Sequence, residues 1–236
     1  MKRINKVLEL ATKYREWHDR LSFDNHPKYY PQHKHYRSIV ANLLHVQGGL
    51  CAYTEVSLCK PALVAPDRWE GGEYKGKLET FGHLDHYNPN LKPRNGWLWS
   101  NFFVIHACIN TKTKLRAVPR VLKPDNDNFE INDYLDYDFS ESIFIIKPQI
   151  NDEKLRADLL HDIKCLGLNH PSIEHQRREF LSPILADLRF SNMTPEQARE
   201  RIYQFYTAYE MAVKQILTTD GNDDNGFVHD VQQQVQ

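Results

Sequence analysis

Four residues whose side chains suit metal-dependent hydrolysis follow one another within a short stretch: Asp85, His86, Asn101 and Asn110. Asp85 offers a hard anionic oxygen, which suits Mg²⁺ or Mn²⁺, and Asn110 offers a neutral oxygen. His86 can act as a general base if its imidazole is neutral near pH 7. A site with so few protein ligands leaves positions for water and a substrate phosphate. The types of these four residues and their order along the chain therefore indicate hydrolysis of a phosphodiester bond.

Neighbouring side chains extend this candidate site. His83 lies two residues before Asp85 and would share its strand face, so it is a candidate third metal contact. Three cations follow Asn110 within two helical turns and could hold a nucleic-acid backbone: Lys112, Lys114 and Arg116.

Each of these features also has an ordinary structural interpretation. A lone Asp-His pair is usually a loop feature, Asn101 could simply cap the helix after it, and the cations could form a solvated helix face.

Hydrophobic periodicity predicts the elements around the site. We expect helices over residues 5–22, 35–47, 101–116, 152–166, 171–190 and 194–217. Gly48 and Gly49 end the second of these. Thr194, Pro195 and Gln197 predict a capped start with a capping box for the last. Short strands and turns are expected over residues 50–100, and a strand over residues 142–146.

The composition is that of an ordinary globular protein, with 41% hydrophobic and 26% charged residues. A net charge of −1 argues against a protein that coats nucleic acid through bulk charge. No stretch approaches the ~20 apolar residues of a membrane span, and the first residues are not those of a signal peptide. We therefore expect a cytoplasmic protein, with the four cysteines as thiols or metal ligands.

The order of Asp85, His86 and Asn101, followed nine residues later by Asn110, resembles the motif of the HNH endonucleases. The resemblance covers residues 48–116. It implies that Asp85 and Asn110 bind one divalent metal, Mg²⁺ or Mn²⁺, and that His86 activates the attacking water. It also implies that Asn101 holds the loop between two strands by hydrogen bonds.

A closer resemblance extends further along the chain, over about residues 35 to 190. Residues 48–55, Gly-Gly-Leu-Cys-Ala-Tyr-Thr-Glu, and residues 166–170, with Arg177 and Arg178 downstream, resemble HNH proteins encoded beside retrons and in Septu phage-defence systems (the PtuB type). This resemblance implies an ABC-type ATPase of the PtuA type as partner. In retron systems it further implies a reverse transcriptase with its RNA–DNA product.

The expected fold is α+β and mostly α-helical, with a ββα-metal (HNH) nuclease module flanked by N- and C-terminal helices. The expected division is a helical region over residues 1–47, the nuclease module over 48–118, a mainly helical region over 119–218 and a disordered tail over 219–236.

The cysteines depart from the family pattern, because many relatives carry two Cys-x-x-Cys pairs that bind structural zinc. In this chain each pair keeps one possible ligand, at Cys51 and His106. Together with Cys59 and Cys108 they could make an altered set, but the spacing is unfavourable and we do not expect structural zinc. Cys165 lies in a predicted helix with no evident histidine partner, so no catalysis is assigned to it.

The functional hypothesis is an HNH endonuclease that acts within an antiviral defence complex. DNA and RNA, including tRNA, both remain open as substrates, because the hydrolytic chemistry is indifferent to the sugar. The alternative is a catalytically degenerate subunit that binds nucleic acid or regulates the complex. A cluster of aromatic and basic residues at 29–36 could suit single-stranded nucleic acid, although a surface loop packed on a helix is favoured there.

Overall fold

The computed structural model describes residues 1–22, 26–112, 117–190 and 192–219, and its fold is α+β. The α-helices of the described residues are α1 (Thr12–His18), α2 (Tyr36–Val46), α3 (Lys92–Asn95), α4 (Ala107–Lys112), α5 (Glu153–Cys165), α6 (Pro171–Arg189), α7 (Pro195–Arg201) and α8 (Tyr206–Thr219). The strands form three two-stranded antiparallel sheets: β1 (Trp69–Glu70) with β2 (Glu73–Tyr74), β3 (Gly82–His86) with β4 (Phe102–His106), and β5 (Leu135–Asp138) with β6 (Ile143–Ile146).

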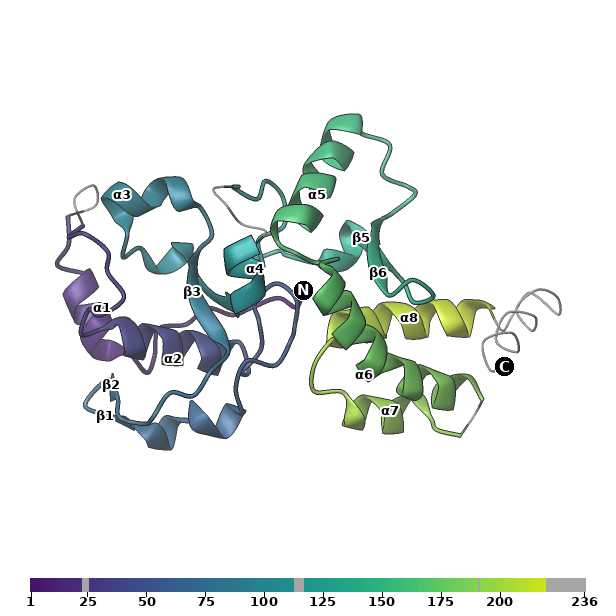
Figure 1. The fold of residues 1–236 in the computed structure, drawn as a ribbon, viewed down its shortest axis with the longest axis horizontal. Coiled ribbons are helices and arrows are strands. Elements are labelled where there is room, and N and C mark those ends of the chain that lie inside the picture. The colour runs from purple at the N-terminus through teal and green to yellow at the C-terminus, as the bar shows by residue number, and fades with distance from the viewer. Residues whose placement is uncertain (23–25, 113–116, 191, 220–236) are drawn as a thin grey trace.

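The elements divide into two parts that lie side by side (Figure 1). The first part holds α1 to α3 and β1 to β4, and the second holds β5, β6 and α5 to α8. Helix α4 and the N-terminus both lie near the junction of the two parts. Among the described helices, none is both long enough and apolar enough to cross a bilayer.

The hairpin of β3 and β4 is the element that carries most of the candidate site. The helix predicted over residues 101–116 is wrong for residues 102–106, which form β4, and helix α4 begins only at Ala107. The run Phe-Phe-Val-Ile over residues 102–105 is aromatic and β-branched and fully buried, which favours a strand. In the antiparallel register, Asp85 lies opposite Phe103 and His86 opposite Phe102.

The N-terminal helix is shorter than the predicted 5–22, because α1 covers only Thr12–His18. The side chain of Asn42 explains the difference. Its Oδ1 accepts the backbone N–H groups of Leu10 and Ala11, and its Nδ2 donates to the carbonyl of Val7. These hydrogen bonds hold the backbone of residues 7–11 against α2 in a non-helical path.

The other helices agree with the sequence analysis except at one break. Helices α2, α5 and α6 and strand β6 confirm the predicted elements to within about one residue. The capping box of Thr194 and Gln197 is present at the start of α7. The predicted single helix over 194–217 is instead split into α7 and α8, and Phe205 takes a φ of 55° just before α8. The predicted disordered tail lies outside the described residues from residue 220 onward.

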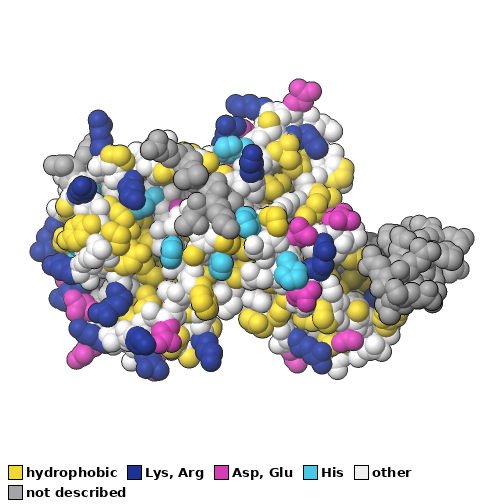
Figure 2. All heavy atoms as spheres, viewed as in Figure 1, with side chains coloured by type: hydrophobic (Ala, Val, Ile, Leu, Met, Phe, Trp, Pro, Cys, Tyr) yellow, Lys and Arg dark blue, Asp and Glu magenta, His cyan; other side chains and the backbone are white. Residues whose placement is uncertain are grey.

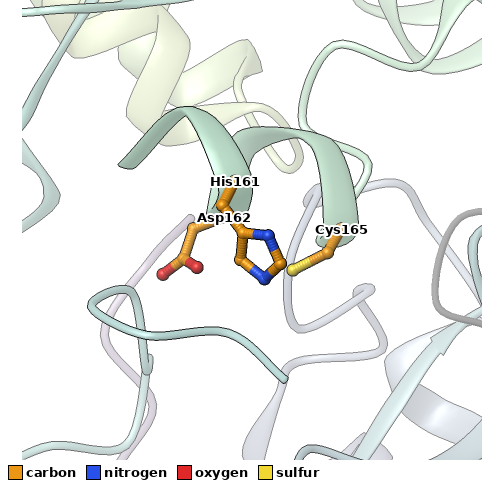
Figure 3. A group of neighbouring side chains, drawn as sticks. All are labelled: His161, Asp162 and Cys165. Carbon is orange, nitrogen blue, oxygen red and sulfur yellow. The ribbon is translucent and has the colours of Figure 1, made fainter. Parts of the chain in front are cut away.

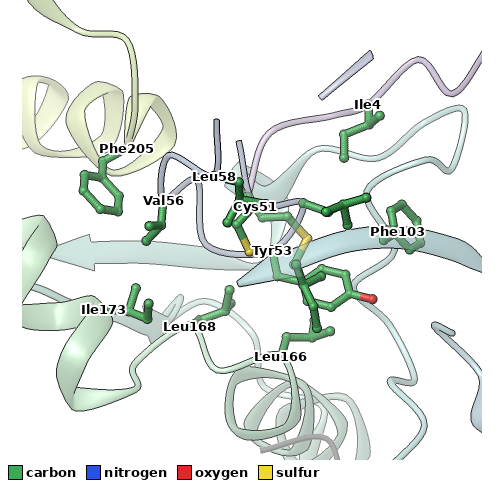
Figure 4. Packing of buried hydrophobic residues seen from close by; sticks show 14 of the residues in the cluster. Ile4, Cys51, Tyr53, Val56, Leu58, Phe103, Leu166, Leu168, Ile173 and Phe205 are labelled. Carbon is green, nitrogen blue, oxygen red and sulfur yellow. The ribbon is translucent and has the colours of Figure 1, made fainter. Parts of the chain in front are cut away.

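One continuous hydrophobic core extends through both parts (Figure 4). Tyr53 and Phe103 from the first part and Leu166 and Phe205 from the second belong to the same buried cluster. Gly167, at the end of α5, lies against α4 with a φ of +66°. A Cβ added there would lie 2.5 Å from Ile109 Cδ1, so only glycine permits this close approach of the two elements.

The residues after α5 hold the second part together. Asn169 bonds both backbone groups of Phe144 in β6, accepting the N–H at 2.8 Å and donating to the carbonyl at 2.7 Å. Arg177 is fully buried and donates to the carbonyls of Ser142 and Leu168. The segment over residues 166–170 thus has structural contacts on two sides, since Gly167 lies against Ile109 of α4 and Asn169 holds β6.

Candidate functional site

The candidate site lies in a strand–strand–helix arrangement formed by β3, β4 and α4. Asp85 and His86 end β3, Asn101 lies immediately before β4, and Asn110 lies on α4. Helix α4 packs against both strands. The structure therefore places the four residues of the sequence motif in one small module.

The carboxylate of Asp85 is buried and receives a hydrogen bond from a tyrosine. Asp85 is 6% exposed, and the hydroxyl of Tyr53 donates to its Oδ2 at 2.7 Å. Burial and the nearby negative charge of Asp85 raise the pKa of the Tyr53 hydroxyl well above its ordinary value, so it stays a proton donor. The Tyr53 segment is held against β4 because Ala52 N–H donates to the carbonyl of Val104.

The imidazole of His86 is held on two sides. Its Nε2 lies 2.9 Å from the carbonyl oxygen of Gly96, which can only accept. This hydrogen bond assigns the proton to Nε2 and leaves the lone pair on Nδ1. The ring packs edge-on against Tyr29 (centroids 4.7 Å apart) and against Phe102 (5.1 Å). The tautomer and orientation are those that a general base with an active Nδ1 requires.

Asn101 ties down the loop that follows β3. Its Oδ1 accepts the backbone N–H of Asn88 at 2.7 Å, and its Nδ2 donates to the carbonyl of Asn88 at 3.0 Å. The carbonyl of Asn101 also accepts the N–H of Tyr87. Asn101 is 3% exposed. These contacts fix the backbone directly after His86, and the alternative of a side-chain helix cap is wrong, since Asn101 caps no helix.

The oxygen donors of Asp85 and Asn110 fit a hard divalent cation such as Mg²⁺ or Mn²⁺. One is a buried carboxylate and the other a neutral amide on the helix that packs on β3. His83, the predicted third contact, is exposed on β3 and lies opposite Ile105. Of the predicted phosphate-binding cations, Lys112 ends α4, and Lys114 and Arg116 lie outside the described residues.

The candidate zinc residues do not gather at one point. The thiol of Cys51 accepts the backbone N–H of His106, and His106 Nδ1 lies 2.9 Å from Cys108 Sγ. Among the described residues, no three of Cys51, Cys59, His106 and Cys108 have ligand atoms within 4.8 Å of one another. Ile109, at the position where the HNH resemblance would place a zinc ligand, is apolar and fully buried. The residues present do not fit a closed four-ligand zinc site.

A second cluster of possible metal ligands lies on α5. The ligand atoms of His161, Asp162 and Cys165 lie within 4.8 Å of one another (Figure 3). The expectation that Cys165 has no histidine nearby is wrong, because His161 lies one helical turn before it. Their spacing of four residues within a predicted helix could have indicated this contact. His161 Nε2 bonds the carbonyl of Val118, and Asp162 accepts three consecutive backbone N–H groups over residues 120–122. These bonds hold residues 118–122 against α5, so we assign the cluster a structural role.

We expect Asp162→Ala to lower the free energy of unfolding by about 3 kcal/mol, because three backbone N–H groups, one buried and two partly buried, would lose a charged acceptor. Urea denaturation followed by circular dichroism measures this. The matched control is Asp158→Ala, one turn earlier, which removes a partly exposed ion pair with Arg120 and should cost less than about 1 kcal/mol. Equal losses in the two variants would refute the structural role.

Two residues of the site were not expected from the sequence. Tyr53 contacts Asp85 across 32 residues, and no local pattern predicts that contact. Tyr29 belongs to the aromatic cluster that was interpreted as a surface loop. In the structure it packs on His86, and burial is the main cause of its raised pKa, with smaller contributions from Tyr36 and Asp85.

Comparison of the chain with family models, with curated proteins and with solved structures gives no significant match. A strand–strand–helix module with a buried aspartate, an oriented histidine and a loop-holding asparagine defines a candidate hydrolytic centre.

Proposed function

We propose that the chain is a metal-dependent endonuclease of the HNH type. The observation that carries the proposal is the placement of His86, with its Nε2 committed to the Gly96 carbonyl, directly beside Asp85. A base and a hard-metal ligand in adjacent positions suit the activation of water next to a metal-bound phosphate.

Each residue of the module has a chemical part in this proposal. Asp85 and Asn110 would hold one Mg²⁺ or Mn²⁺ ion. When bound, that ion neutralises charge on the phosphate and on the leaving oxygen. His86 accepts the proton of the attacking water at Nδ1, and Asn101 keeps the following loop in place. Tyr53 orients the Asp85 carboxylate through its hydroxyl.

We further propose that the nuclease works in an antiviral defence complex with an ABC-type ATPase, with a reverse transcriptase and its RNA–DNA product in a retron system. The support is the resemblance of residues 48–55 and 166–170 to the retron and Septu proteins. In this structure the first of these segments supplies Tyr53 to Asp85 and the second supports α4. The alternative, a degenerate subunit that only binds nucleic acid, is favoured by the missing zinc ligands.

The test is a cleavage assay on the purified chain with Mg²⁺ or Mn²⁺, offering duplex DNA, single-stranded DNA and total tRNA. We expect cleavage of at least one substrate, and its loss when the metal is removed with EDTA. The substrate consumed distinguishes DNA from RNA. Cleavage that persists in EDTA would contradict the proposal. Absence of cleavage both alone and with the partner ATPase would favour the degenerate subunit.

A further inference from the structure

Two stretches that contribute residues to the candidate site carry cations but no acidic residue, in a chain whose net charge is −1. Residues 26–54 contain three Lys or Arg and no Asp or Glu, and residues 86–124 contain seven Lys or Arg and no Asp or Glu. In Figure 2, Lys and Arg side chains gather around an apolar patch on the part of the molecule that holds α1 to α3. Such local charge is the electrostatic signature of a nucleic-acid-binding face.

Some of the exposed side chains of these stretches belong to the segments around Tyr29 and Lys92, and we call this set the basic strip. It consists of five side chains from residues 28–34 and 92–94: Lys28, Tyr30, Lys34, Lys92 and Arg94. None of its four cations forms an ion pair with any residue that the structure describes. Their charge is therefore available to a phosphate backbone.

The basic strip adjoins the candidate catalytic histidine. Lys92 Nζ lies 4.8 Å from the centroid of the Tyr29 ring, and that ring packs on His86. Gly96 makes this arrangement possible, because a Cβ added there would lie 2.9 Å from the Tyr29 Cβ. The carbonyl of the same glycine accepts the His86 hydrogen bond. The contacts that orient His86 therefore also place the strip beside it.

Tyr30 gives the strip an exposed aromatic surface. Its side chain is 46% exposed, although one edge packs on His33 (centroids 5.3 Å apart) and on Trp97 (6.3 Å). These contacts hold the ring without covering it. A held and exposed ring among cations is the combination on which unpaired bases stack, whatever their sequence.

We propose that the basic strip binds single-stranded nucleic acid and leads it to His86. The phosphates lie along Lys28, Lys34, Lys92 and Arg94, and one unpaired base stacks on Tyr30. The inference rests on the proposed function, in that the bound strand is the nuclease substrate. A continuous duplex has no unpaired base to offer Tyr30, so single strands and the loops of folded RNA are the preferred substrates.

The test is fluorescence anisotropy with labelled 20-nucleotide single strands of DNA and RNA, titrated over a range of salt concentrations. The variant Lys28→Ala/Lys34→Ala/Arg94→Ala omits Lys92, whose contact reaches His86 through Tyr29. We expect it to bind at least about tenfold more weakly, with a salt slope smaller by about 2, since each lost phosphate contact removes roughly 0.7 for single strands. The control Lys60→Ala/Lys77→Ala/Lys154→Ala changes the net charge equally and should bind as the wild type does.

A second pair of variants tests the stacking. Tyr30→Ala should weaken single-strand binding on the order of tenfold and leave the weaker duplex binding unchanged. Tyr203→Ala, which removes an exposed tyrosine from the other part of the molecule, should change neither. Equal weakening by the two triple variants, or no effect of Tyr30→Ala, would overturn the inference, as would wild-type protein that binds no oligonucleotide.

The assays separate this inference from the proposed nuclease activity. If the strip is needed for binding but no metal-dependent cleavage occurs, either alone or with the partner ATPase, the binding surface is supported and the nuclease activity is refuted. If cleavage requires His86 but is unchanged in the strip variants, the nuclease activity is supported and the role of the basic strip in substrate binding is refuted.

Discussion

Replacing His86 with alanine should reduce cleavage by about 10²- to 10⁴-fold, the usual contribution of a positioned general base. The reason is specific to this structure. Nε2 is committed to the Gly96 carbonyl at 2.9 Å, so Nδ1 is the nitrogen that can accept the proton of the attacking water. Alanine removes that nitrogen. Single-turnover cleavage at saturating metal measures the loss.

The control for this prediction must distinguish catalysis from folding. His86 packs on Tyr29 and Phe102, so its removal also leaves a small cavity. Circular dichroism and oligonucleotide binding should therefore remain close to wild type in the same preparation. The matched variant His175→Ala, which removes an exposed histidine on α6, should cleave normally. Full cleavage by a folded His86→Ala protein would exclude His86 as the base.

The local features of the candidate site could be predicted from the sequence. The types and spacing of Asp85, His86, Asn101 and Asn110 indicated one module, and the structure places all four in it. Helix starts with strong local signals, such as the capping box at Thr194, were also predictable. In each case the information lies within a few residues, where side-chain chemistry and backbone preference act directly.

Strand β4 shows where periodicity was insufficient. A run of four apolar residues fits a buried strand or one face of a helix equally well, and it was assigned to the helix that follows it. Its register with β3 depends on tertiary contacts, such as the Gln47 side chain, which bonds both the N–H and the carbonyl of Val104. Burial on both faces decides the strand, and burial is not visible in the sequence.

Contacts between distant residues were not predictable at all. Glu55 takes a φ of 61° and binds the N–H and hydroxyl of Thr207, 152 residues away, at the start of α8. The amino group of Met1 lies 3.5 Å from the same carboxylate. Tyr53, two residues earlier, reaches Asp85. One turn thus links the candidate site to the last helix.

The second large effect is expected for Asp85→Asn, which should lower cleavage by about 100-fold or more at millimolar Mg²⁺. Asparagine keeps an oxygen that can accept the hydrogen bond of the Tyr53 hydroxyl, so the fold and the tyrosine contact should be retained. The substitution removes only the negative charge with which Asp85 would bind the metal. The loss should therefore appear as weaker metal binding, and raising the Mn²⁺ concentration should restore part of the activity. By contrast, His86→Ala should bind the metal as the wild type does, and raising the Mn²⁺ concentration should not restore its activity.

Metal titrations of the two variants and of Tyr53→Phe assign the roles separately. Tyr53→Phe removes the donor to Asp85 but keeps the carboxylate, so metal affinity should fall only about 10- to 100-fold, as for other residues that orient a ligand. If Asp85→Asn bound Mn²⁺ as tightly as wild type, Asp85 would not be a ligand, and its burial beside Tyr53 would be purely structural. If instead Asp85→Asn loses affinity while His86→Ala keeps it, metal binding and proton transfer are divided between these two adjacent residues. That division is what the backbone turn after His86, held by Asn101, makes possible.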